Sequence, residues 1–227
     1  ITTVQENQKF MCIYNKLSQS PKFKVLFLDT FGESDNLNVK FELVDHIPGA
    51  NGQASILPNS TVNQTTGEVN LNLLIKIDKS YMNSHSAIGV ARTIMHESIH
   101  AYLILKHVKC NLGTPFVEII EDIDDKSLEE LLNYYYDTAC PEQEQHEFMF
   151  EHMIPTMSEI LADVRDDFVP LHHQQQVEDN YTFIDENNPL GLQTPWDWLQ
   201  FYDYFSMVGL TQTNAFINNI ENNPARL

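Results

Sequence analysis

Hydrophobic and polar residues alternate in two stretches of the first half of the chain. The longer series runs over residues 69–77, and a shorter one covers 39–43. Because side chains on one face of a strand recur every second residue, both stretches predict β-strands. Residues 47–68, which lie between them, are rich in Gly, Pro, Asn and Ser. This composition predicts a long irregular stretch with a short strand at 54–57.

Elsewhere the apolar positions recur at helical spacing, and Pro, Gly and Ser provide the expected start and stop signals. The predicted helices cover residues 4–17, a segment from Pro21 to Phe31, 86–107, 127–137, 142–168 with a kink at Pro155, and 196–207. The segment 170–195 is polar and rich in Gln and Asn, which predicts a surface loop. Strands followed by helices are typical of an α+β fold.

The helix at 86–107 differs from the others because its apolar residues point in nearly every direction. Met95, Ile99 and Leu103 lie on one side, and Ile94 and Leu105 lie on the other. A helix that is apolar all round is buried. We therefore expect this helix to run through the interior, with its polar residues enclosed by protein.

Length and composition agree with one folded domain. The chain has 227 residues, of which 42% are hydrophobic, and this is enough to form a sizeable core. We expect a single domain over 1–227, made of N-terminal helices at 1–33, the sheet and central helix at 37–108, and a helical part at 126–227. No apolar run approaches the roughly 20 residues of a membrane helix. Because the chain begins with Ile1, we expect a preceding segment to have been removed.

The charge of the chain excludes some partners. The net charge is -19, from 32 acidic and 13 basic residues. Phosphate backbones are bound by clusters of Lys and Arg, so the sequence predicts no nucleic-acid binding. Cys12, Cys110 and Cys140 have no C-x-x-C spacing and allow at most one disulfide. The Asn-rich, Lys-poor composition is typical of secreted or surface-associated bacterial proteins.

Residues 96–100 read His-Glu-Ser-Ile-His, inside the central helix. Two histidines four residues apart lie about 40° apart on a helix, so both rings reach one cation. Glu97 lies next to them, where it can hold and deprotonate a water that the metal activates. The alternative is a pair of core histidines bonded to the backbone, with Glu97 in a salt bridge. The burial expected for this helix favours zinc, because unpaired ionisable groups inside a protein cost several kcal/mol.

A catalytic zinc needs a third protein ligand and an open position for water. His107 is too far along the same helix, about two turns beyond His100. The segment that begins near Glu142 has an apolar face of Met and Phe that can pack on the central helix. The downstream candidates are Glu118, Glu121, His146, Glu147, Glu151 and His152.

The stretch from His96 to Leu103 resembles the active-site helix of SprT-like (Spartan-type) zinc metallopeptidases, and residues 145–153 are similar to that family's second segment. The resemblance implies a zincin-like fold, with a small mixed sheet packed on the HExxH helix and further helices C-terminal. It also implies His146 as the third ligand, with Glu151, His152 and Glu147 as competitors. Glu147 stands where the family usually has Gly. Because the chain is acidic and has no Cys-rich zinc ribbon, the family's DNA-linked role is not carried over.

The leading hypothesis is a zinc metallopeptidase with His96, His100 and His146 as ligands and Glu97 as general base. A protein or peptide substrate would lie extended beside an edge strand, either 69–77 or a strand in 54–57. The candidate stabilisers of the oxyanion are Tyr81, Tyr134, Tyr135, Tyr136 and His152. The rival hypotheses are a zinc-binding module without peptidase activity and a toxin-type effector domain of a larger secreted protein.

Overall fold

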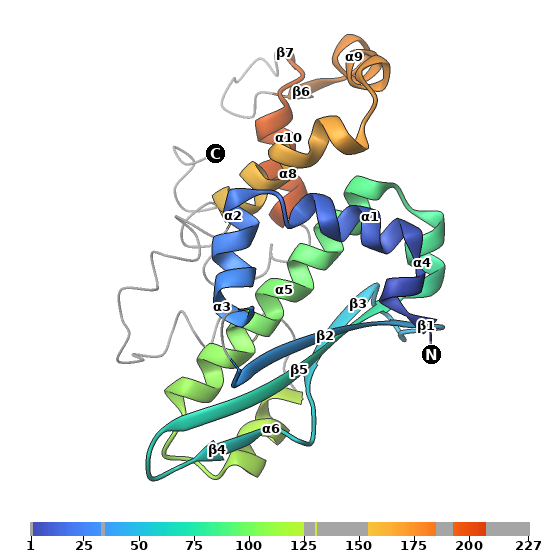
Figure 1. Cartoon of the computed structure of the whole chain (residues 1–227). Coiled ribbons are helices and arrows are strands. Elements are labelled where there is room, and N and C mark those ends of the chain that lie inside the picture. Colours follow the sequence, from blue (N-terminus) through green and yellow to red (C-terminus); the bar gives the residue numbers. More distant parts are fainter. Residues whose placement is uncertain (1, 33–34, 125–129, 131–153, 185–192, 208–227) are drawn as a thin grey trace.

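The computed structural model describes residues 2–32, 35–124, 130, 154–184 and 193–207 (Figure 1). The fold is α+β. Its strands are β1 (Thr2–Thr3), β2 (Leu37–Val44), β3 (Gly52–Ile56), β4 (Thr61–Asn63), β5 (Glu68–Asp78), β6 (Thr182–Ile184) and β7 (Gln193–Pro195). Its helices are η1 (Val4–Glu6), α1 (Gln8–Leu17), α2 (Pro21–Phe23), the π-turn η2 (Lys24–Leu28), α3 (Asp29–Phe31), α4 (Lys79–Ser84), α5 (Ala87–Cys110), α6 (Phe116–Asp124), α8 (Ile154–Phe168), α9 (Leu171–Asn180) and α10 (Trp198–Met207).

The main sheet is small and mixed, with β5 at its centre. The strand order is β1-β2-β5-β3, and β4 also pairs with β5. β2 runs parallel to β5, with Leu37 opposite Leu71, whereas β3 and β4 run antiparallel to it. The alternation that predicted the strand at 69–77 is observed, because Val69, Leu71 and the other odd-numbered residues of β5 are buried.

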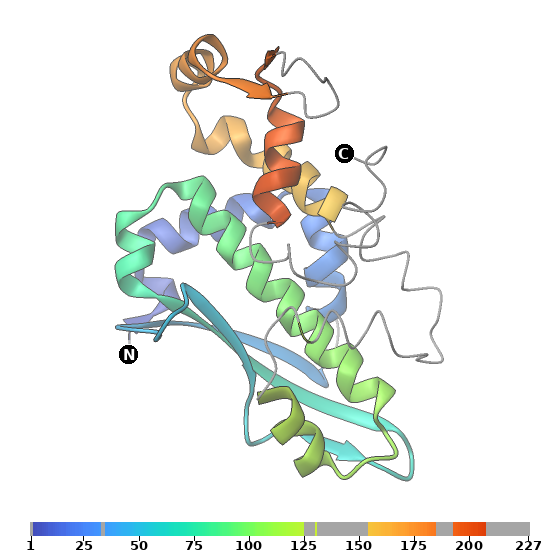
Figure 2. The ribbon, with the colours of Figure 1, turned by 180° about the vertical axis from the view of Figure 1, so that it is seen from behind.

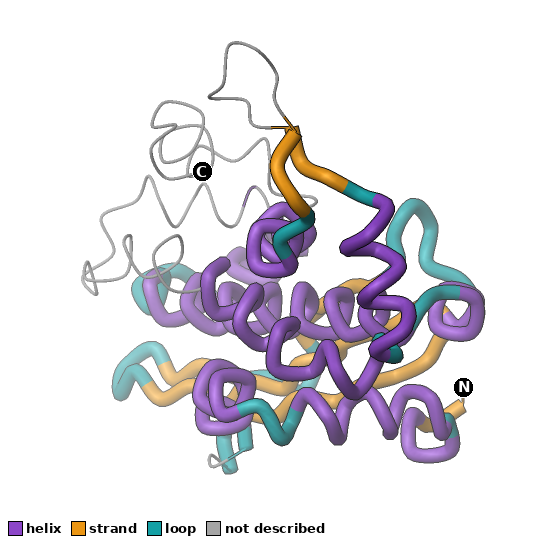
Figure 3. Tube along the Cα trace, turned by 90° about the horizontal axis from the view of Figure 1, so that it is seen from above, coloured by secondary structure: helices purple, strands orange, loops and turns teal. Residues whose placement is uncertain are grey.

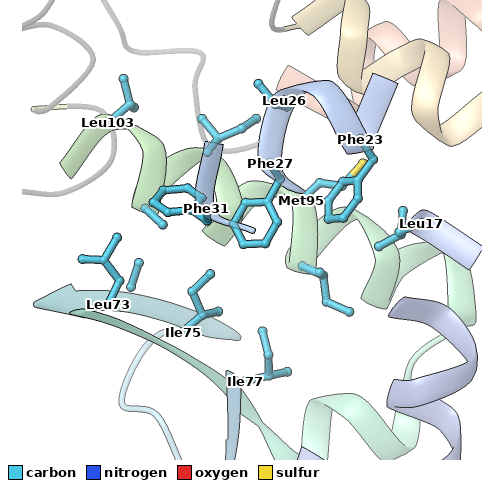
Figure 4. Close-up of a cluster of buried hydrophobic side chains, with 14 of the residues drawn as sticks. Leu17, Phe23, Leu26, Phe27, Phe31, Leu73, Ile75, Ile77, Met95 and Leu103 are labelled. Carbon is cyan, nitrogen blue, oxygen red and sulfur yellow. The ribbon is translucent and has the colours of Figure 1, made fainter. Parts of the chain in front are cut away.

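The core lies between this sheet and the helices on one of its faces (Figures 1 and 2). Leu73, Ile75 and Ile77 project from β5 towards Phe27 of η2 and Met95 of α5 (Figure 4). Seen from above, the helices lie over the strands as a second layer (Figure 3). α8 and α10 pack against each other on the far side of α5 from the sheet (Figures 1 and 2). α5 is therefore enclosed by protein on both sides, as its all-round apolar sequence predicted.

Polar contacts join the N-terminal helices to α8. Lys16 forms an ion pair with Asp167 at 2.7 Å, and Lys22 forms another with Glu159. The hydroxyl of Ser20 donates to Asp163 at 2.9 Å. These contacts hold α1 and α2 against α8.

Three sequence-based predictions differ from the structure in detail, two in where a helix begins and one in the number of strands. The helix predicted at 4–17 is divided: Val4–Glu6 form the 3₁₀ helix η1, and α1 begins at Gln8, because the side chain of Asn7 accepts from the backbone N–H of Phe10 and caps α1 there. The helix predicted from residue 196 begins at Trp198, where Asp197 accepts from the backbone N–H groups of Leu199 and Gln200. The irregular stretch at 47–68 contains two strands, β3 and β4, instead of one.

The loop predicted at 170–195 is also wrong. Residues 171–180 form the helix α9, and β6 pairs with β7 beyond it. The buried side chain of Gln174 explains the helix, because its amide donates to Asp166 and to the backbone oxygen of Val169. The polar composition of this segment predicted a solvent-exposed loop. Gln is nevertheless a good helix former, and its buried amide is stable when it is hydrogen-bonded.

The remaining predicted helices lie partly outside the described residues. This holds for 127–137 and for 142–153, and Pro155 lies in the first turn of α8, where proline is accommodated. None of the helices within the described ranges is long and apolar enough to cross a membrane.

The buried carboxylate of Asp78 joins three parts of the fold. It caps α4 by accepting from the N–H of Tyr81 at 2.8 Å, and it accepts from the N–H of Ile47 at 3.1 Å. The hydrogen bond from Tyr81 is the main cause of its lowered pKa; the N–H of Ile47 and the charge of His46 lower it further, against the effect of burial.

We expect Asp78→Ala to lower the free energy of unfolding by about 2 kcal/mol at pH 7, because a helix cap is lost and a buried N–H is left unpaired. Since the folded pKa is lowered, the stabilisation is complete above the unfolded value near 4 and is lost as pH falls through the folded pKa. Denaturant unfolding at pH 7 and pH 3 should therefore show a smaller difference at pH 3. The exposed Asp45→Ala variant is the control, and equal stability of Asp78→Ala and wild type at pH 7 would contradict the assignment.

Candidate metal centre

The candidate site lies in the middle of α5. The helix is capped at its start by the hydroxyl of Ser86, which accepts from the N–H of Gly89. Glu97 is buried, with 5% of its surface exposed, whereas His96 and His100 are partly exposed. The structure thus encloses the glutamate more fully than the two histidines.

Glu97 faces the strand β3 at its closest approach to α5. A Cβ atom added to Gly52 would lie 2.6 Å from Cγ and 2.7 Å from Oε1 of Glu97. Such distances are far below van der Waals contact, so a side chain at position 52 would force Glu97 or the strand to shift. Sequence analysis placed Gly52 in an irregular stretch and missed this role. The available signal was a lone Gly at the edge of a short strand, which often marks a close backbone approach.

The carboxylate of Glu97 is not fully satisfied by protein. Its Oε2 atom is buried and accepts no hydrogen bond, and the possible ion-pair partner among the described residues is His100, with Nδ1 at 3.7 Å. The alternative of a Glu97 salt bridge finds no better partner than this contact among the described residues. A buried carboxylate oxygen without a donor is costly, and a site that holds a water or a cation removes that cost.

The electrostatics of His96 favour the neutral imidazole. Burial of the ring lowers its pKa most, Glu97 opposes this with its negative charge, and the positive charges of His100 and Arg92 lower it further. Neutral imidazole is the form that binds metal ions.

The predicted third ligand, His146, lies outside the described residues, as do Glu147, Glu151 and His152. Within the ranges that the structure describes, no group of three or more His, Cys, Asp or Glu is placed to hold a metal. His107 is buried and its Nε2 lies 3.0 Å from Asp122 of α6, so that histidine has a partner of its own.

Tyr81 is the one described candidate for stabilising an oxyanion, and the structure gives it another task. Its hydroxyl donates to the backbone oxygen of Gly89 and accepts from Thr93, both in the first turns of α5. It therefore supports the start of the helix. Tyr134, Tyr135 and Tyr136 lie outside the described residues.

The edge strand beside the site is β3, not the stretch 69–77, because β5 lies at the centre of the sheet. The N–H of Asp78 bonds the oxygen of Asn51, and the N–H of Leu57 bonds the oxygen of Asn72. Backbone groups alternate between the two sides of a strand. With the register of β3 on β5, the N–H and C=O groups of Gly52, Ala54 and Ile56 consequently point to the outer edge. No described strand pairs with that edge.

Of the two cysteines described, Cys110 at the end of α5 is disulfide-bonded, and Cys12 is an exposed free thiol. Cys140 lies outside the described residues. One bridge and one free thiol agree with the cysteine count.

Comparison of the chain with protein-family models, with curated proteins and with solved structures finds no match.

Proposed function

We propose that the protein is a zinc-dependent peptidase in which His96 and His100 hold the metal together with His146, and in which Glu97 is the general base. The observation that supports this most is the buried Oε2 atom of Glu97, which lacks a hydrogen-bond donor and lies 3.7 Å from a histidine ring of the motif. In a purely structural helix, a buried carboxylate oxygen without a donor would lower the free energy of unfolding and serve no purpose.

The donor set fits zinc. Two imidazoles one helical turn apart are typical zinc ligands, and their partial exposure leaves room for a third ligand and for substrate. When bound, zinc supplies Lewis acidity that polarises a peptide carbonyl and lowers the pKa of a water molecule.

Glu97 would accept the proton of the attacking water at its carboxylate and pass it to the nitrogen of the leaving amine. The contact with Gly52 fixes the direction of this carboxylate, since Cγ and Oε1 lie against the β3 backbone. The other oxygen, Oε2, is the one left available for the water. Burial keeps competing solvent away from the base.

The outer edge of β3 provides a natural place for an extended substrate. Its free backbone groups at Gly52, Ala54 and Ile56 can pair with a peptide as an added strand, independently of the peptide's side chains. Because Gly52 also touches Glu97, a peptide paired there would pass next to the base.

We expect one zinc per chain in protein purified without chelator, and zinc-dependent cleavage of a denatured protein substrate. Elemental analysis gives the first quantity, and the second follows from activity that is lost with chelator and restored by zinc. His96→Ala and His100→Ala should lose both the metal and the activity. Wild-type protein that takes up less than about a tenth of an equivalent of added zinc would refute the proposal.

We expect His146→Ala to lower zinc affinity by more than about 10–100-fold. A loss of that size already follows when a residue that only hydrogen-bonds to a metal ligand is removed. The same titration on Glu147→Ala, Glu151→Ala and His152→Ala provides matched comparisons. If His146→Ala binds zinc like wild type while one of these variants does not, the third ligand is the other residue.

A further inference from the structure

Arg92 lies on α5 one helical turn before His96, so Arg92, His96 and His100 follow each other along one side of the helix. Its guanidinium packs over the ring of Phe205 in α10, with Cζ 5.1 Å from the ring centroid. Arg92 makes no ion pair or hydrogen bond with any described residue. The side chain is only partly exposed, and its charge is close enough to His96 to lower the pKa of that histidine.

Arg92 lacks an acidic partner among the described residues although the chain is rich in acids. Acidic residues outnumber basic ones by 32 to 13. The other described arginine, Arg165, also packs over an aromatic ring, that of Trp198, yet it donates to Asp166 at 2.8 Å. Lys16 and Lys22 are paired with carboxylates as well.

The contact with Phe205 is a cation–π contact, and the N–H donors of Arg92 bond no described residue. The N–H donors lie in the plane of the group, and they match the two oxygens of a carboxylate. A cation–π contact attracts the guanidinium without pairing these donors as a carboxylate would. Arg92 therefore has donors left for an anion, which the described residues do not supply.

We propose that Arg92 binds a carboxylate of the substrate at the candidate site. This inference rests on the proposed peptidase function and specifies its substrate class, namely peptides with a carboxylate near the cleaved bond. The carboxylate comes either from an Asp or Glu side chain or from the C-terminus of the peptide. Since the net charge of -19 repels anions at a distance, the effect is one of selectivity at the site.

Cleavage of matched peptides tests the proposal. Two kinds of peptide pair that wild type cleaves are used. In the first pair, Glu or Gln flanks the cleaved bond. In the second pair, the C-terminus is free or amidated. Wild type is expected to prefer the carboxylate form of one pair by about 10–100-fold in kcat/KM, as for hydrogen bonds to charged groups. Arg92→Gln should remove this preference, Arg92→Lys should retain part of it, and Arg165→Gln is the matched control that keeps it. The pair that responds identifies the source of the carboxylate.

A second readout does not depend on turnover. Zinc-loaded Glu97→Gln protein is titrated with acetyl-Ala-Ala-Glu-amide against acetyl-Ala-Ala-Gln-amide, and with acetyl-trialanine in its free and amidated forms. The carboxylate forms should bind more tightly, and adding Arg92→Gln should abolish the difference. Circular dichroism and zinc content confirm that each variant is folded and loaded.

The outcomes separate the two proposals. Equal cleavage and equal binding of carboxylate and amide forms by wild type would overturn the role of Arg92 while leaving the peptidase intact. An equal loss for all peptides in Arg92→Gln would likewise overturn it, because that result marks a structural residue. Carboxylate binding that needs Arg92, in a protein that cleaves nothing, would refute the peptidase and support the Arg92 site.

Discussion

Replacement of Glu97 by Gln should leave the fold and the zinc content unchanged and lower peptide hydrolysis by about 10²–10⁴-fold, the usual contribution of a general base. The amide has nearly the same shape as the carboxylate, so it fits against Gly52 without displacing β3. It cannot accept a proton from water, and therefore the chemical step fails while binding remains.

The measurement combines zinc analysis, circular dichroism and cleavage of a denatured protein substrate. Glu118→Gln is the matched control, because Glu118 is an exposed glutamate on α6 and lies outside the proposed site. Cleavage by Glu97→Gln at the wild-type rate, with zinc bound, would show that another group is the base. Loss of zinc in this variant would show that Glu97 has a part in holding the metal.

Replacement of Gly52 by Ala is expected to lower both the stability of the protein and its activity. The new methyl group would lie 2.6 Å from Cγ of Glu97, so either the strand or the glutamate must shift. Overpacking of this kind costs about 1–3 kcal/mol of stability. A displacement of the base by about 1 Å is enough to lower activity roughly 10²-fold.

Zinc affinity should change much less than activity in Gly52→Ala. The three atoms nearest to the new Cβ all belong to Glu97, and none belongs to a histidine. Gly113→Ala is the control, since a Cβ there meets nothing within 4 Å. Denaturant unfolding and kcat/KM are the two quantities to compare. Gly52→Ala with unchanged activity and stability would mean that the contact with Glu97 is not required.

The sequence was most informative where one periodicity extends over many residues. The odd-numbered apolar positions of 69–77 and the all-round apolar helix at 86–107 are observed as β5 and α5, and the α+β class followed from them. Short elements were harder, because three to five residues carry too little pattern. β4 and the β6–β7 pair were missed for this reason, and α9 was missed because its apolar content is low.

For the candidate site, local spacing identified His96, Glu97 and His100, because one helix carries all three. Gly52 and Arg92 required the fold, since their meaning depends on what lies opposite them, Glu97 in one case and Phe205 in the other. No local sequence pattern predicts which strand packs against a helix, or which arginine has no carboxylate partner. His146 stays a prediction, because it lies outside the described residues.

The contacts between the N-terminal helices and α8 bear on how the chain folds. The Ser20–Asp163 and Lys16–Asp167 contacts join residues 143 and 151 positions apart, and the parallel pairing of β2 with β5 brings together Asn38 and Asn72, which are 34 apart. Contacts between residues so distant in sequence close long loops, and chains that depend on them fold more slowly than helical bundles of similar size. During synthesis, α1 and α2 must wait for more than half of the chain before α8 covers them. The part of their surface that α8 covers stays exposed for that interval, when a chaperone would be of most use.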